Sequence, residues 1–170
     1  MKKLFDYYCK GLEVIIVVAL VLMVLLIFSN VVLRYAFNSG IALSEEISRW
    51  LFVWITFLGA IVALHERRHL GSDFLVGKLP PGGKKVCLCV GYLLMLFVCW
   101  LLFSGALEQT TINWDVTAPT SGAPVAIFYA SGIVFSISAG LFIAFDLFNL
   151  LTGKLADQEL VIIRESEDQL

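Results

Sequence analysis

Four long apolar runs dominate the sequence, and short polar segments separate them. The runs cover approximately residues 12–33, 45–64, 86–107 and 124–151 of the 170. A helix needs about 20 apolar residues to cross the bilayer core. The second run reaches that length only if the charged segment SEEISR (44–49) forms its first turn. We therefore predict an all-α integral membrane protein with four transmembrane helices and an amphipathic interfacial turn before the second span.

The overall composition agrees with this prediction. Hydrophobic residues make up 59% of the chain and charged residues 15%, and the mean hydropathy is +0.89. Soluble proteins average about 45–50% apolar and about 25% charged residues. The basic start MKKLF resembles a signal peptide, but the run from Leu12 to Leu33 is longer than the usual 7–15 apolar residues or so and ends without a small-residue cleavage site. We expect an uncleaved first helix, a single membrane domain over 1–170 and an acidic cytoplasmic tail at 152–170.

The basic residues are sorted between the two sides of the predicted membrane. Ten of the 12 lie before the first span, between the second and third, or after the fourth: Lys2, Lys3, Lys10, Arg67, Arg68, Lys78, Lys84, Lys85, Lys154 and Arg164. Positively charged loops stay in the cytoplasm, so we predict that both termini and the central loop are cytoplasmic. Segments 35–43 and 108–123 then face outward, which in a bacterium is the periplasm, and the chain is a multi-pass protein of the inner membrane.

No ionisable side chain stands near the middle of any apolar run. Glu13 and Asp146 lie near the ends of theirs, whereas ion and proton pathways place such residues within the membrane. The pattern argues against a pump or exchanger that acts alone. One alternative stays open, a homodimeric four-helix exporter that uses Glu13 as its proton-coupled carboxylate.

The cysteines and histidines do not form a recognisable metal or cofactor site. They lack the spacing of a zinc set or a third ligand: Cys9, Cys87, Cys89, Cys99, His65 and His69. We expect no metal and no cofactor. The net charge of −2, without a basic tract, gives no reason to expect nucleic acid as a partner. A membrane anchor of a redox enzyme, with haem on His65 and His69, is a second alternative.

The charged segment at the start of the second run has a structural interpretation. Ser44 suits an N-cap, and Glu45 and Glu46 complement the positive end of the helix dipole. The spacing of Glu45 and Arg49 favours an ion pair along the helix. Because the preceding loop is short, Arg34 could also reach Glu45 or Glu46 across the hairpin. Apolar residues recur on one side of the segment, where tryptophans suit a membrane interface: Leu43, Ile47, Trp50 and Trp54.

Within residues 30–76 the chain reads NVVLRYAFN and then LSEEISRWLFVWITFLGAIVALHERRHLGSDFL. These stretches resemble the small membrane subunit, the Q or DctQ-like subunit, of tripartite ATP-independent periplasmic (TRAP) transporters. The matching features occur in the family's order: Arg34-Tyr35, Glu45-Glu46, Arg49, Trp54, Phe57-Leu58-Gly59-Ala60, His69 and Asp73. The sequence departs from the family at Gly71-Ser72, where aliphatic residues are commoner.

The resemblance implies a transporter component and not an enzyme. In this family the small subunit pairs with a large membrane subunit, which carries the substrate and sodium sites and moves as an elevator. A soluble periplasmic binding protein delivers an organic acid, such as a C4-dicarboxylate or a sialic acid, and we favour sialic acid here. The implied role is a fixed scaffold, with structural or interface positions at Arg34, Glu45, Glu46, Arg49, Trp50, Trp54, His69 and Asp73.

Overall fold

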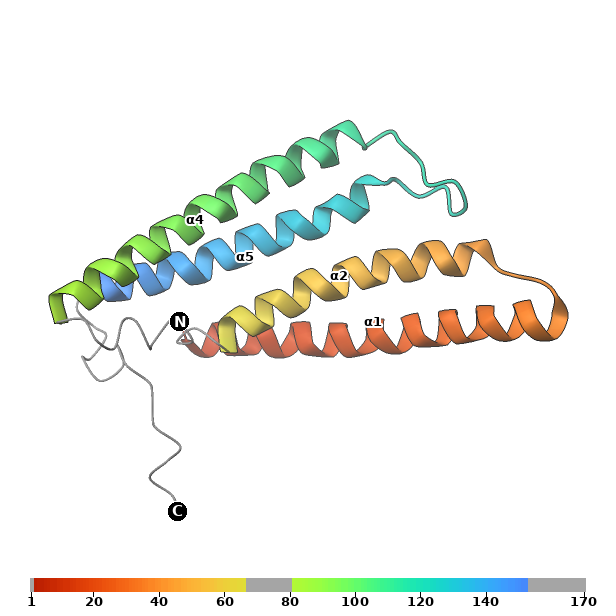
Figure 1. The fold of residues 1–170 in the computed structure, drawn as a ribbon, viewed down its shortest axis with the longest axis horizontal. Helices are drawn as coiled ribbons and strands as arrows, with labels where there is room; N and C mark the ends of the chain where they lie inside the picture. The colour runs from red at the N-terminus through yellow and green to blue at the C-terminus, as the bar shows by residue number, and fades with distance from the viewer. Residues whose placement is uncertain (1, 67–80, 153–170) are drawn as a thin grey trace, which may run out of the picture.

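The computed structural model describes residues 2–66 and 81–152, which form four helices (Figure 1). Their bounds are α1 Lys2–Phe37, α2 Ala42–Glu66, α4 Pro81–Ile112 and α5 Ala126–Leu151. All four are long and apolar enough to cross a membrane. Within these two described ranges the structure has no strand, and extended pairing is limited to one isolated bridge between Thr117 and Pro124. The predicted all-α membrane fold with four spans is confirmed.

Three of the helices, α1, α2 and α4, extend beyond their apolar runs at both ends. α1 has 36 residues and is about 54 Å long at 1.5 Å per residue, against a hydrocarbon core of about 30 Å. Its first turns carry a stripe at helical spacing, Phe5, Cys9 and Leu12, which packs into the core. The predicted interfacial turn at 44–49 is likewise part of the continuous helix α2.

A left-handed residue ends α1. Asn38 has φ 54°, a conformation that asparagine tolerates better than most residues. The N–H of Ser39 donates to the carbonyl oxygen of Leu33 at 3.1 Å, six residues back, and so satisfies a carbonyl group of the last helical turns. Only residues 38–41 then separate α1 from α2, so the two helices form a tight antiparallel hairpin.

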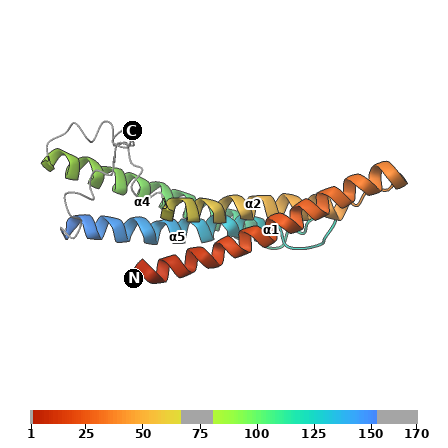
Figure 2. The ribbon, with the colours of Figure 1, turned by 90° about the horizontal axis from the view of Figure 1, so that it is seen from below.

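The four helices lie side by side in the order α1, α2, α5, α4 (Figures 1 and 2). α5 is central and is lined by small residues that allow close approach. A Cβ added at Gly132 would lie 3.2 Å from the Cβ of Ala106, which shows how closely α4 and α5 pack. We call the end with connections 38–41 and 113–125 the hairpin end. The terminal end is the opposite one, where α1 and α4 begin and α2 and α5 end (Figure 1).

The buried apolar cluster joins α1, α2 and α5. Its buried members are Cys9, Leu12, Leu58, Ile61, Val62 and Phe142. By contrast, large aliphatic and aromatic side chains along α1 and α4 are mostly exposed, such as Val17 at 59% and Phe97 at 56%. Exposed apolar helices of this length need a lipid or protein environment. The chain is therefore a multi-pass membrane protein.

Candidate functional site

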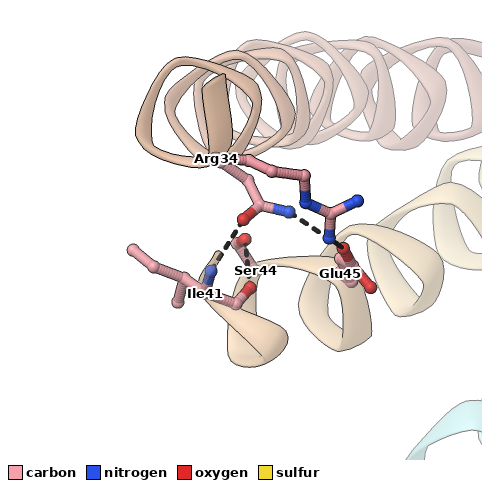
Figure 3. A network of polar contacts seen from close by, with 5 residues as sticks. Arg34, Ile41, Ser44 and Glu45 are labelled. Carbon is pink, nitrogen blue, oxygen red and sulfur yellow. Dashed lines mark hydrogen bonds and ion pairs between the residues drawn. The ribbon is translucent and has the colours of Figure 1, made fainter. Parts of the chain in front are cut away.

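The α1–α2 connection is held by a polar network centred on Asn30 and Glu45 (Figure 3). Asn30 Nδ2 donates to Glu45 Oε1 at 3.1 Å, and Asn30 Oδ1 accepts the N–H of Ile41 at 2.7 Å. Arg34 forms an ion pair with the same carboxylate oxygen. Asn30 and Arg34 are four residues apart and so share one face of α1. Of the two pairings open to Arg34 across the hairpin, the structure has the one with Glu45.

The members of this network differ in exposure. Asn30 retains only 7% of its accessible surface, whereas the side chains of Arg34 and Glu45 are 59% and 50% exposed. An exposed ion pair contributes little because water screens it. Two hydrogen bonds from a buried amide are worth more, since breaking them leaves polar groups unsatisfied. The amide of Asn30 therefore defines the turn more than the ion pair does.

The predicted N-cap at Ser44 is wrong. α2 begins at Ala42, and Ser44 lies in its first turn, where the hydroxyl donates to the carbonyl oxygen of Ile41 at 2.7 Å (Figure 3). The backbone N–H of Ile41, just before the helix, is satisfied by Asn30 of the preceding helix instead. Because this acceptor comes from α1, α2 starts earlier than its own sequence indicates.

Glu46 joins the α4–α5 connection to the start of α2 through hydrogen bonds. Its carboxylate accepts the backbone N–H of Thr120 at 3.1 Å and that of Ser121 at 3.2 Å, and it also accepts the Ser121 hydroxyl. Glu46 is buried, with 7% of its surface exposed. Adjacent helix residues point about 100° apart, so Glu45 turns toward α1 while Glu46 turns toward the α4–α5 connection. These two glutamates tie both hairpins to the start of α2.

The α4–α5 connection has its own internal order. The N–H of Ala118 donates to the carbonyl oxygen of Ala123 at 2.9 Å, and that of Val125 donates to Val116 at 2.9 Å. Gly122 takes a positive φ of 68°, which glycine adopts without strain. α5 then begins at Ala126, two residues later than the apolar run suggested, because Pro124 is paired with Thr117. The connection is thus an internally hydrogen-bonded loop whose backbone donates two N–H groups to Glu46.

Arg49 does not form the ion pair that its spacing from Glu45 favoured. Glu45 turns instead to Asn30 and Arg34 on α1. Among the described residues, no hydrogen bond or ion pair joins the exposed guanidinium of Arg49 to another group. That side chain lines an open hollow of about 370 Å³ between the start of α2, the α4–α5 connection and the start of α5.

The two predicted interface tryptophans lie on the α5 side of α2. Trp54 donates its indole N–H to the carbonyl oxygen of Ile127 at 3.2 Å, so it joins the two helices. Trp50 is half-buried and lines the hollow beside Arg49. Both therefore stand in the layer where α2 meets α5, close to the hairpin end.

The remaining residues that the sequence singled out lie toward the terminal end of the molecule or outside the described residues. His69 and Asp73 fall in 67–80, which the structure does not describe. His65 bonds Asp6 of α1 at 2.8 Å, and Glu13, the carboxylate of the exporter alternative, is exposed on α1. In the described part of the chain, no group of three His, Cys, Asp or Glu side chains could hold a metal ion.

Three residues that donate to the two glutamates were not among the predicted site residues: Asn30, Thr120 and Ser121. Asn30 carried a readable signal, since an amide in an apolar run four residues before Arg34 is costly unless it is bonded. Thr120 and Ser121 carried none. They bind Glu46 across 74 and 75 residues of sequence through their backbone N–H groups, and Ser121 binds it through its hydroxyl as well.

Comparison with known proteins identifies the family. The model of "Tripartite ATP-independent periplasmic transporters, DctQ component" matches residues 23–153. A Haemophilus influenzae protein named as a TRAP transporter small permease protein is 42% identical over 137 residues, covering 81% of this chain and 85% of the relative. The Vibrio cholerae "C4-dicarboxylate TRAP transporter small permease protein DctQ" is 34% identical over 82 residues, covering 48% of this chain and 33% of that relative.

A third relative is much longer than this chain. The "Sialic acid TRAP transporter permease protein SiaT" of Haemophilus influenzae is 28% identical over 131 residues, which cover 76% of this chain but 21% of that protein. A region like this chain is therefore one part of a much longer permease polypeptide there. The family match covers well over half of the sequence and agrees with the four-helix membrane fold. The chain belongs to the DctQ family and is a small permease subunit of a TRAP transporter.

Proposed function

We propose that the chain is a scaffold subunit, one that supports transport without carrying the substrate or ion pathway itself. The observation that carries this proposal is the absence of ionisable residues from the middle of the spans. Segments 14–33, 50–64, 86–107 and 126–145 hold no Asp, Glu, Lys, Arg or His. Coupled ion or proton transport uses such residues within the membrane. The bonded carboxylates Glu45 and Glu46 lie at the hairpin end, where they connect helices.

The partners in this proposal are a large TRAP membrane subunit and a periplasmic substrate-binding protein. Two observations support a large membrane partner. The exposed apolar side chains of α1 and α4 leave wide surfaces for another membrane protein, and in one relative the matching region is about a fifth of a longer permease. We assign structural or interface roles to the eight site positions predicted from the sequence, including His69 and Asp73 outside the described residues.

We further propose that the complex uses a sodium gradient to take up an organic acid across the bacterial inner membrane. The names of relatives include a sialic acid and a C4-dicarboxylate transporter, and both substrates are carboxylates. Both termini lie in the cytoplasm, because ten of the 12 basic residues fall on that side. The hairpin end then faces the periplasm and offers its surface to the binding protein.

Reconstitution tests the scaffold role. The full chain, the neighbouring large permease and the binding protein are placed in proteoliposomes, and uptake of radiolabelled sialic acid or C4-dicarboxylate is followed with and without a sodium gradient. We expect uptake only when all three are present with sodium. Uptake by this chain alone would refute the scaffold proposal, and uptake by the large permease and binding protein without this chain would show that no scaffold is needed.

Thiol labelling tests the orientation separately. Thr117 is exposed at the hairpin end and Lys3 is exposed at the terminal end, so each is replaced by cysteine in a background without the native cysteines. An impermeant maleimide should label Thr117→Cys in intact spheroplasts and Lys3→Cys only after lysis. The reverse pattern would invert the topology.

A further inference from the structure

We infer that the hollow at the hairpin end binds a phospholipid headgroup that carries both a phosphate and an ammonium, as in phosphatidylethanolamine, with the phosphate on Arg49. The hollow has a volume of about 370 Å³. Because a water molecule takes about 30 Å³ of liquid volume, this space equals roughly a dozen waters. A phosphoethanolamine group with its glycerol oxygens and carbons has a similar number of non-hydrogen atoms.

The charged side chains that line the hollow differ in whether they form hydrogen bonds or ion pairs within the protein. Glu46 is bonded by Thr120 and Ser121, and Glu45 is paired with Arg34. Arg49, between them in the same wall, has no hydrogen bond or ion pair to any part of the chain that the structure describes. A guanidinium offers a planar fork of donors that fits two phosphate oxygens at once. Arg49 is therefore the group that an anion would approach.

The depth of Arg49 points to a lipid as the source of that anion. Arg49 is seven residues from the start of α2, about 10 Å along the axis, and the whole helix is only about 37 Å long. A span of this length centred on a core of about 30 Å extends about 4 Å beyond each border, so the backbone of Arg49 lies about 7 Å inside the hydrocarbon. A long basic side chain there extends toward the headgroups, and lipid phosphates form a continuous layer at that level.

Aromatic side chains around the hollow agree with this position. Trp50 of α2 and Phe128 and Tyr129 of α5 line it, together with small apolar residues of the α4–α5 connection. Tryptophan and tyrosine gather where the hydrocarbon meets the headgroups. The lining thus offers apolar surface to the glycerol backbone and the first acyl carbons, while Arg49 and the two glutamates face the polar group.

The two carboxylates select the kind of headgroup. A carboxylate has about four acceptor sites, and Glu45 accepts two bonds and Glu46 three among the described contacts. The remaining sites can accept from a primary ammonium but not from a trimethylammonium, which has no N–H. They also repel a headgroup with a net negative charge. We therefore expect phosphatidylethanolamine to bind more tightly than phosphatidylcholine, and phosphatidylglycerol to bind most weakly.

Native mass spectrometry of the full chain tests this order. The protein in a neutral detergent is titrated with dioleoyl phosphatidylethanolamine, phosphatidylcholine or phosphatidylglycerol, and bound lipids are counted at each concentration. One molecule of the ethanolamine lipid should bind at least about tenfold more tightly than the glycerol lipid, the size expected for a charged hydrogen bond. Equal binding of the three lipids, or tighter binding of phosphatidylglycerol, would overturn the proposal without any substitution being needed.

Variants then locate the site. Arg49→Gln should weaken the ethanolamine lipid about tenfold, and Arg49→Lys should restore part of the loss, since it keeps the charge without the planar fork. Lys10→Gln, which removes another exposed cation at the opposite end, should change nothing. If Arg49→Gln leaves lipid binding unchanged but abolishes co-purification with the large permease, Arg49 meets an acidic side chain of that protein, and the lipid site is refuted.

Discussion

At the hairpin end, carboxylate and amide side chains accept hydrogen bonds from the backbone, whereas at the terminal end aromatic rings pack against one another. Glu46 and Asn30 between them accept three backbone N–H groups. At the other end the ring of Phe5 meets Phe142 at 4.8 Å and Phe145 at 5.6 Å, both edge to face. The two ends of the molecule are thus held by two kinds of interaction.

The backbone explains the difference. At the hairpin end the chain leaves the helices twice, and the N–H groups of those connections need acceptors that the helices cannot supply. Around Phe142 the helices are continuous, so their backbone groups are bonded internally and side-chain packing joins them. Charged residues beside a span can therefore serve the fold, and in this chain both glutamates of the motif accept hydrogen bonds from other segments.

Phe142→Ala should have the largest effect, and it should act on the terminal end alone. Phe142 is 3% exposed and its ring contacts Phe5, Tyr8 and His65. Loss of a buried phenylalanine leaves a cavity and costs about 3 kcal/mol. Thermal unfolding in detergent measures the loss. Phe148→Ala, at an exposed position of the same helix, is the control, and an equal loss there would show that Phe142 packs no better than a lipid-facing ring.

Glu46→Gln should come next, and it should loosen the hairpin end while the terminal end stays intact. One carboxylate oxygen accepts from Thr120 and the other from Ser121. Glutamine presents an NH₂ group where one of those acceptors stood, so a donor meets a donor. Hydrogen exchange at the amides of Thr120 and Ser121 should speed up several-fold.

The matched control for this variant is Glu108→Gln, which removes an exposed acid near the same end of α4. Exchange at Thr120 and Ser121 should stay unchanged in that variant. If both substitutions accelerate exchange equally, the general loss of negative charge matters and the specific bonds of Glu46 do not. Specific hydrogen bonds to Glu46 would then no longer distinguish the hairpin end from the terminal end.

How much of this arrangement the sequence predicts depends on the range of each interaction. The four spans follow from run length, and a pairing of Arg34 with Glu45 or Glu46 across the first hairpin follows from a short loop. These are local constraints. The partners of Glu46 are not local, because they lie 74 and 75 residues further along the chain. Two of the three donors are backbone N–H groups, which every residue type except proline carries.

The start of α2 shows how a tertiary contact overrides a local rule. Ser44 is a favourable N-cap by residue type, yet the acceptor that satisfies the turn is Asn30 of another helix. His65 and Asp6 give a second case, since 59 residues separate them and only the packing of α1 against α2 brings them together. No periodicity encodes either contact.

Asn30→Ala should destabilise the protein less than Phe142→Ala, by about 1–2 kcal/mol. The substitution leaves the N–H of Ile41 without its acceptor and removes one of the two donors to Glu45. Unfolding in detergent gives the size of the loss, and exchange at the Ile41 amide shows its location. Ser29→Ala, at the neighbouring exposed position, should be neutral. If Asn30→Ala is neutral as well, the amide does not define the turn.

Arg34→Gln should have the smallest effect, roughly 0.2–1 kcal/mol, although it removes the ion pair of the same network. Its side chain is 59% exposed and that of Glu45 is 50% exposed, so water and salt screen the pair, and Asn30 still donates to Glu45. The difference between wild type and variant should shrink further in about 1 M salt, where the screening length falls to about 3 Å. A loss as large as that of Asn30→Ala, unchanged by salt, would mean that charge and not backbone hydrogen bonding holds the hairpin end, and the distinction between the two ends would have to be drawn on electrostatic grounds.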